Sequence, residues 1–309
     1  MNLLKLIRWP NLIIVGLTQS LLFYCLLVPA FQQTGLSTLL DFPHFLLLIF
    51  STILIAAGGY IINDILDYPI DMINKPEKVI VEQKIPLKSA WNLYYGTIIL
   101  GLVISLYLAN HVNNLPLVLI FPTAVFLLWQ YSKNWKKQVL IGNLTVALFC
   151  AMVAGIVWFA ERHSFGQLWL QHPEVAYPYA QVFIAYLLFA FLSTLFREVV
   201  KDAEDVLGDE LSSCRTLPVV YGIKKTKMVA GTFGIVLLLS LVYWAYQQFS
   251  SSHYWEVAYL VFAIIVPTKL ALFLLDQAKS KANFHQLSQL AKYIMLSGLL
   301  YLIVYYFRT

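Results

Sequence analysis

Two short stretches of the sequence concentrate acidic residues at the spacing of one helical face. Five of the sixteen Asp and Glu residues lie between Asp64 and Glu82, and six lie between Glu198 and Glu210. Residues three or four positions apart stand on the same face of a helix. That spacing is shared by Asn63, Asp64, Asp67 and Asp71 in the first stretch, and by Glu198, Asp202, Asp205 and Asp209 in the second. Each stretch therefore predicts an acidic helix face.

Such faces require a compensating cation. Like charges at these spacings destabilise a helix by a few tenths of a kcal/mol per pair. Magnesium takes hard oxygen ligands, uses a few carboxylates, and fills its remaining positions with water and phosphate oxygens. The alternative is that the acids are solvated loop residues paired with nearby lysines. Because two such stretches each follow an apolar segment, we expect a Mg²⁺-bridged diphosphate between two helix ends.

The segments that carry these faces have the composition of a membrane protein. The chain has 309 residues, of which 60% are hydrophobic and only 12% are charged. About 20 mostly apolar residues cross a hydrocarbon core of about 30 Å. Nine such segments are present, at residues 13–31, 45–62, 93–108, 115–131, 139–159, 182–196, 229–249, 254–275 and 290–307. The sequence therefore predicts an all-α polytopic membrane protein, with one domain over residues 1–309 and nine transmembrane helices.

The basic residues predict the orientation. With nine spans and an inner N-terminus, nearly all lysines and arginines fall in inner connections, with Arg162 and Arg308 outside and Lys269 within a span. The positive-inside rule then predicts that the N-terminus and both acidic stretches lie on the cytoplasmic side and that the C-terminus lies outside. The expected location is the cell (inner) membrane. The net charge of +5 follows from this topology, so nucleic acid is not an expected partner.

Both acidic stretches also resemble known signatures. Residues 59–76 contain the pattern N-D-x-x-D-x-x-x-D, which is similar to the first signature of the UbiA superfamily of intramembrane prenyltransferases. Residues 201–209 are similar to the second, D-x-E-D-x-x-G-D. The resemblance covers the whole chain. The first motif follows the second span and the second motif follows the sixth, and nine spans with the motifs at these two places are the layout of that family. It implies a bundle around a central cavity, where a metal-bound diphosphate leaves a prenyl donor and an acceptor captures C1.

The resemblance assigns roles to particular residues. The residues expected to carry catalysis by holding Mg²⁺ and the diphosphate are Asn63, Asp67, Asp71, Asp202 and Asp205, with Asp64 and Asp209 as additional metal ligands.

The expected substrate contacts are basic or amide side chains. These are Lys133 and Lys136 in a Tyr-Ser-Lys turn, Arg197 and Lys201 beside the second motif, Asn11 in an R-x-x-N pattern, and Asn143 at the start of the fifth span. The lysines of the turn also suit a positive-inside anchor, and the asparagines also suit contacts between helices.

The acceptor is the least determined part of the prediction. Arg197 and Glu198, together with residues 73–76, resemble the branch that alkylates geranylgeranylglyceryl phosphate with geranylgeranyl diphosphate to make ether lipid. Three departures are residues 78–83, where relatives commonly continue Arg-Pro-x-Pro-Ser-Gly, Glu210, which replaces a frequent arginine, and Pro69, which should bend the helix inside the first motif. The alternatives are prenylation of an aromatic acceptor (a quinone precursor, homogentisate or a chlorin) and, more remotely, a transporter with an acidic ion path.

Overall fold

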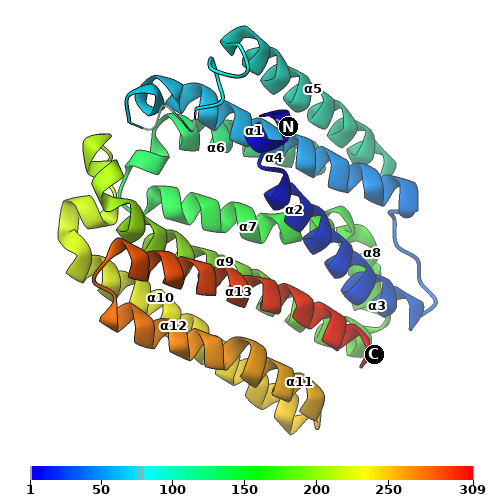
Figure 1. Ribbon diagram of the computed structural model, residues 1–309. Coiled ribbons are helices and arrows are strands. Elements are labelled where there is room, and N and C mark those ends of the chain that lie inside the picture. Colours follow the sequence, from blue (N-terminus) through cyan, green and yellow to red (C-terminus); the bar gives the residue numbers. More distant parts are fainter. Residues whose placement is uncertain (1, 75–76, 78, 309) are drawn as a thin grey trace.

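A computed structural model describes residues 2–74, 77 and 79–308, and nearly all of them lie in helices (Figure 1). The α-helices are α1 (Asn2–Leu6), α2 (Trp9–Leu22), α3 (Val28–Gln32), α4 (Phe42–Asn74), α5 (Leu87–His111), α6 (Leu117–Lys133), α7 (Ile141–Ala160), α8 (Arg162–Gln171), α9 (Pro173–Leu211), α10 (Leu217–Ser250), α11 (Tyr254–Tyr259), α12 (Val266–Gln277) and α13 (Lys281–Tyr306). Shorter π and 3₁₀ turns are η1 (Phe23–Leu27), η3 (Trp135–Lys137) and η4 (Leu260–Ile265). Residues 75, 76 and 78, which belong to the acceptor prediction, lie outside the described residues.

Eight helical segments of the described chain are long and apolar enough to cross a membrane. They are Trp9–Gln32, Phe42–Pro69, Leu87–His111, Ile141–Ala160, Pro173–Leu211, Leu217–Ser250, Tyr254–Gln277 and Lys281–Tyr306. The predicted span at 115–131 corresponds to α6, which has only 17 residues and a length of about 25 Å at 1.5 Å per residue. The predicted order of nine apolar helices is therefore present, with eight of full spanning length and one shorter.

Two of the spans contain a π turn just before a proline. The turn η1 precedes Pro29 on α3, and η4 precedes Pro267 on α12. Proline lacks an N–H group, and its ring clashes with the carbonyl four residues earlier. A single π turn relieves such a clash without ending the helix. Both segments therefore remain helical across the membrane, where an irregular backbone would leave polar groups unsatisfied.

Both acidic stretches are helical extensions of membrane spans. The predicted spans end at residues 62 and 196, whereas α4 continues to Asn74 and α9 continues to Leu211. In Figure 1 these two helix ends and the η3 turn lie at the same end of the bundle. The expectation from spacing, that each stretch forms a helix, is confirmed.

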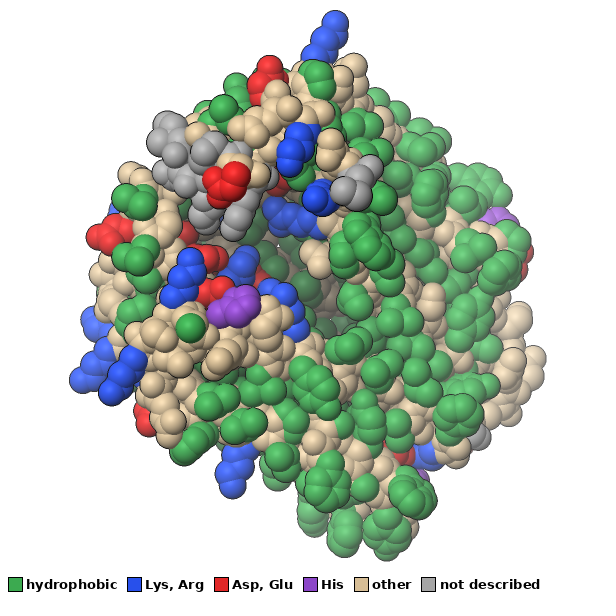
Figure 2. Space-filling model, viewed as in Figure 1, with side chains coloured by type: hydrophobic (Ala, Val, Ile, Leu, Met, Phe, Trp, Pro, Cys, Tyr) green, Lys and Arg blue, Asp and Glu red, His purple; other side chains and the backbone are tan. Residues whose placement is uncertain are grey.

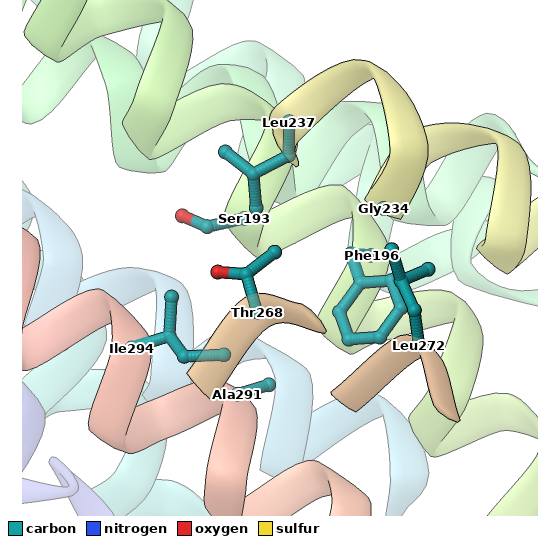
Figure 3. Close-up of a pocket in the computed structure, with 8 residues that line it drawn as sticks. All are labelled: Ser193, Phe196, Gly234, Leu237, Thr268, Leu272, Ala291 and Ile294. Atoms are coloured by element: carbon teal, nitrogen blue, oxygen red, sulfur yellow. The ribbon is translucent and has the colours of Figure 1, made fainter. Parts of the chain in front are cut away.

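The helices on one side of α9 form a closely packed wall. Figure 3 shows Ser193 and Phe196 of α9 meeting residues of α10, α12 and α13 around a pocket of about 10 Å³, which is too small for a substrate. At this crossing, a Cβ built on Gly234 would lie 2.6 Å from Leu272 Cδ2. Small residues let helices approach closely in membranes, so this wall leaves substrate space to the other side of α9.

The surface has two kinds of region. Figure 2 shows hydrophobic side chains over most of the visible face, as expected for contact with lipid. Lysine, arginine, aspartate and glutamate side chains gather around a hollow on the left of the same view. The charged region belongs to the end of the bundle that carries the acidic helix extensions.

Candidate active site

The acidic ends of α4 and α9 border one cavity of about 290 Å³. It is lined by side chains from α4, α6, η3, α7, α9 and the link into α10. The charged and amide residues of the lining are Asp67, Asp71, Lys136, Lys137, Asn143, Glu198, Lys201, Asp202, Asp205 and Asp209. Two helix faces that are about 130 residues apart in the chain therefore meet at one site.

The acidic face of α4 is bridged by a lysine. Lys136 Nζ lies 2.5 Å from Asp67 Oδ1 and donates to Asn63 Oδ1 at 2.9 Å. The Nδ2 group of Asn63 donates to Asp67 Oδ2 at 3.0 Å. Burial lowers the pKa of the Lys136 ammonium, and the Asp67 carboxylate offsets part of that effect. The ammonium thus occupies the position between two oxygen ligands where a metal cation would compensate the same charge.

The η3 turn fixes the position of Lys136. A Cβ built on Gly142, at the start of α7, would lie 2.9 Å from Lys136 Cα, so only glycine allows this approach. On the other side, the backbone N–H of Arg215 donates to the carbonyl of Lys137 at 2.8 Å. The turn is therefore held between α7 and the α9–α10 link.

The acidic face of α9 is held by neutral hydrogen-bond donors. Asn143 Nδ2 donates to Asp202 Oδ2 at 2.9 Å, and Thr216 Oγ1 donates to Asp209 Oδ2 at 2.9 Å. Asp205 and Lys201 lie on the cavity lining between and beside them. Both carboxylates thus accept a hydrogen bond from a neutral side chain, whereas Asp67 accepts one from the ammonium of Lys136.

The donor chemistry of the two faces fits a hard divalent cation. Carboxylate and amide oxygens of Asn63, Asp67, Asp202 and Asp205 are the ligand types that Mg²⁺ prefers. Among the described residues, no three Asp, Glu, His or Cys side chains converge closely enough to enclose a metal ion by themselves. The site therefore suits a metal that completes its coordination with phosphate and water, rather than a cage built from protein alone.

Five of the residues predicted from sequence are not among those that line the cavity, and one of them, Asn63, contacts the lining residues Asp67 and Lys136. Asp64 Oδ1 accepts from Arg8 Nη2 at 3.2 Å, and Asn11 Nδ2 donates to the hydroxyl of Tyr60 at 3.1 Å. The remaining two are Lys133, whose ammonium lies 4.6 Å from the ring centre of Trp129, and Arg197, which pairs with the neighbouring Glu198.

Other lining residues did not receive a role from the sequence. Tyr131, Lys137, Cys214 and Thr216 face the cavity. Tyr131 belongs to the Tyr-Ser-Lys turn noted in the sequence, and no local pattern distinguishes the other three from ordinary loop or helix residues. Glu198 is different, because its spacing already placed it on the acidic face of α9.

The sequence profile of the UbiA prenyltransferase family matches residues 21–303. The chain belongs to the UbiA prenyltransferase family. It is therefore a prenyltransferase and an integral multi-pass membrane protein, as its two motifs and its apolar helices predicted.

Curated relatives and solved structures agree with this assignment. The prenyltransferase is 35% identical over 254 residues to a digeranylgeranylglyceryl phosphate synthase from Methanosphaera stadtmanae, covering 79% of this chain and 81% of that protein. It is 30% identical over 290 residues to a protein of the same name from Methanococcoides burtonii, covering 94% and 92%.

Two solved structures share the fold. One, from work on digeranylgeranylglyceryl phosphate synthase in membranes, is 25% identical with a TM-score of 0.71 and covers 100% of this chain and 98% of that one. The other, a UbiA homologue from Archaeoglobus fulgidus bound to GPP and Mg²⁺, is 14% identical with a TM-score of 0.61 and covers 98% and 100%.

Proposed function

We propose that this prenyltransferase transfers a geranylgeranyl group from geranylgeranyl diphosphate to the hydroxyl group of geranylgeranylglyceryl phosphate, forming an ether lipid. The names of the relatives support this acceptor, since they cover most of both chains. The observation that carries the reaction type is the meeting of two acidic helix faces at one cavity with lysines on its wall.

The diphosphate of the prenyl donor binds between the two acidic faces. Asn63, Asp67 and Asp71 on α4, and Asp202, Asp205 and Asp209 on α9, are the residues that hold Mg²⁺ with it. Bound magnesium neutralises the charge that develops on the leaving diphosphate. Asp64 is assigned instead to fixing the start of α2, through its contact with Arg8.

Basic residues of the lining complete the diphosphate site. Lys136 and Lys201 reach the cavity, where the ammonium of Lys136, which lies on Asp67 and Asn63, would also contact a bound diphosphate. Lys133 does not take part, because its ammonium lies over Trp129. Preorganised cations of this kind stabilise the leaving group without reorganisation during the reaction.

The site lies at the inner membrane surface, as the distribution of basic residues indicates. Its acidic end takes up the diphosphate from the cytoplasmic side, while the apolar helices below it keep the prenyl chain and C1 from bulk water. A dry cavity protects the developing allylic cation from capture by solvent.

The test is prenyl transfer by the purified protein in detergent, with geranylgeranyl diphosphate and a panel of glyceryl-phosphate and aromatic acceptors, with and without Mg²⁺. We expect a magnesium-dependent ether product that is lost in Asp67→Ala and Asp202→Ala and retained in Lys133→Met. An aromatic product without an ether lipid would refute the acceptor, and activity surviving both aspartate substitutions would refute the metal site.

A further inference from the structure

An alcohol acceptor, which the proposed function assigns to this enzyme, creates a requirement that the acidic metal site does not meet. The hydroxyl oxygen gains a bond to C1, so its proton must leave during or immediately after bond formation. The aspartates of both faces are assigned to the metal, and the lysines are assigned to the diphosphate. A further group near C1 must accept the proton.

Glu198 lies where such a group is needed. Its side chain is 13% exposed and lines the same cavity as the acidic faces. It stands on the face of α9 that carries Asp202, one turn earlier in the helix, which corresponds to about 6 Å along the axis. Because α9 runs from the outer to the inner end of the bundle, Glu198 lies deeper in the membrane than the aspartates.

This depth matches the expected position of C1. A prenyl donor whose diphosphate lies at the level of Asp202 and Asp205 must extend its chain away from the aqueous end, toward the apolar part of the bundle. C1 is the first carbon of that chain. Glu198 therefore lies at the level where the acceptor oxygen approaches C1, while the aspartates lie at the level of the leaving group.

The surroundings of Glu198 also suit an anionic acceptor. Arg197 Nη1 contacts Glu198 Oε1, and the buried Nε of Arg197 has no hydrogen-bond partner among the described residues. Lys292 on α13 is close enough to interact electrostatically with both of them and with Lys201. A buried guanidinium N–H without a partner is a costly arrangement, which a phosphate oxygen of the acceptor would relieve.

Several other elements also face this region. Tyr60 of α4, Tyr131 of α6 and Cys150 of α7 interact electrostatically with Glu198. Tyr131 lines the cavity, as Glu198 does. The other carboxylates that interact with these groups are Asp67 and Asp202, which are assigned to the metal, and Glu204, which contacts His285. Glu198 is therefore the carboxylate left to accept the proton.

We propose that Glu198 is the catalytic base that accepts the hydroxyl proton of the acceptor. In this step the bond between C1 and the diphosphate oxygen breaks, and its electron pair leaves with the diphosphate. A bond forms between C1 and the acceptor oxygen, the O–H bond breaks, and the proton moves to the carboxylate of Glu198. The proton is released to water at the inner end of the cavity when the products leave, so no oxidant or reductant is required.

The test compares Glu198→Gln with wild type and with Glu210→Gln, a change to an exposed glutamate of the same helix that does not line the cavity. We expect Glu198→Gln to lower kcat for ether formation about 100- to 10,000-fold, the usual contribution of a general base. Binding of the unreactive thiolodiphosphate analogue of the prenyl donor should change less than threefold. Glu198→Asp should regain part of the activity, and Glu210→Gln should match wild type.

Analogue binding separates catalysis from structure. Glu198→Gln keeps the shape of the side chain and removes the proton acceptor, so turnover should fall while analogue binding stays within threefold of wild type. Loss of analogue binding in parallel with turnover, or turnover within threefold of wild type, would overturn the role of Glu198. A wild-type enzyme that prenylates only aromatic acceptors would overturn the proposed function, and this inference with it.

Discussion

The two acidic faces of the cavity carry similar residues but are compensated differently. On α4, Asp67 is bridged by Lys136 and Asp64 is paired with Arg8. On α9, Asp202 and Asp209 accept from the neutral groups of Asn143 and Thr216. Asp67 is thus paired with an ammonium group, whereas the hydrogen bond that orients Asp202 comes from a neutral amide, and the basic partner on the α9 face, Arg197, is paired with Glu198.

This difference indicates that the two faces respond differently to a metal ion. A cation at Asp202 would meet a carboxylate that the hydrogen bond from Asn143 has already oriented. A cation at Asp67 would compete with the ammonium of Lys136, whose charge another anion would then have to balance. The diphosphate of the prenyl donor is that anion, so metal binding on α4 should depend on the substrate more strongly than metal binding on α9.

The largest expected effect comes from removing the charge of Asp202, which a neutral amide orients. We expect Asp202→Asn to lower kcat/KM about 1,000-fold and to abolish the binding of Mn²⁺ to the enzyme without substrate, measured by electron paramagnetic resonance. Asp67→Asn should lower kcat/KM to a similar extent but retain Mn²⁺ binding without substrate. Equal loss of Mn²⁺ binding in both variants would contradict the comparison.

Removing the ammonium of Lys136 should raise the affinity for the metal and lower the affinity for the prenyl diphosphate. In Lys136→Met, Asp67 loses its competing cation, so Mn²⁺ should bind more tightly in the absence of substrate. Affinity for the prenyl diphosphate should fall about 10- to 100-fold, because a charged hydrogen bond contributes about 1.5–3 kcal/mol. Isothermal titration calorimetry measures both affinities.

The matched control for this substitution is Lys133→Met, whose ammonium lies over Trp129 outside the cavity lining. It should change neither affinity by more than twofold. A similar decrease in both variants would mean that general positive charge at the inner surface, rather than the bridge to Asp67, determines binding.

A smaller effect is expected from the neutral donors of the α9 face. Asn143→Ala removes the hydrogen bond to Asp202, which should reduce kcat/KM about tenfold at a typical free energy of about 1.5 kcal/mol for a bond to a charged group. Thr216→Val, which removes the contact with Asp209, should have a weaker effect, because Asp209 lies one turn farther from Asp205 toward the end of α9. A stronger effect of Thr216→Val would place the metal closer to Asp209 than to Asp202.

The smallest effect on turnover is expected at Cys214, which lines the cavity near both faces. Burial raises the pKa of this thiol, and nearby Asp209 adds to the effect, so less thiolate is present at neutral pH than in a free cysteine. Alkylation by a maleimide should be slow at pH 7 and faster as the pH rises toward 9. Prenyl diphosphate with Mg²⁺ should protect the thiol, as measured by peptide mass spectrometry, while Cys214→Ser should keep activity within twofold of wild type.

Much of the architecture was predictable because it depends on local patterns. Continuous apolar segments predicted the order of the membrane helices, and the three- and four-residue spacing of the acids predicted that α4 and α9 continue beyond the membrane. Helix boundaries were harder to judge. The predicted segment 115–131 and α6 both have 17 residues, but α6 begins at Leu117 and ends at Lys133, since hydrophobicity does not fix where a helix starts.

The sequence by itself determined the family motifs, the ligand types and the helix faces that carry them. Only the tertiary structure decided which charges meet: Lys136 reaches Asp67 across 69 residues of chain, Asn143 reaches Asp202 across 59, and Arg8 reaches Asp64 across 56. It also decided that Lys136 lines the cavity while Lys133 lies over Trp129, and that Glu198 lines the cavity below the aspartates. The physical reason is that spacing along one helix is set by its own geometry, whereas a pairing between helices depends on how they pack and on the turns that hold each side chain in place.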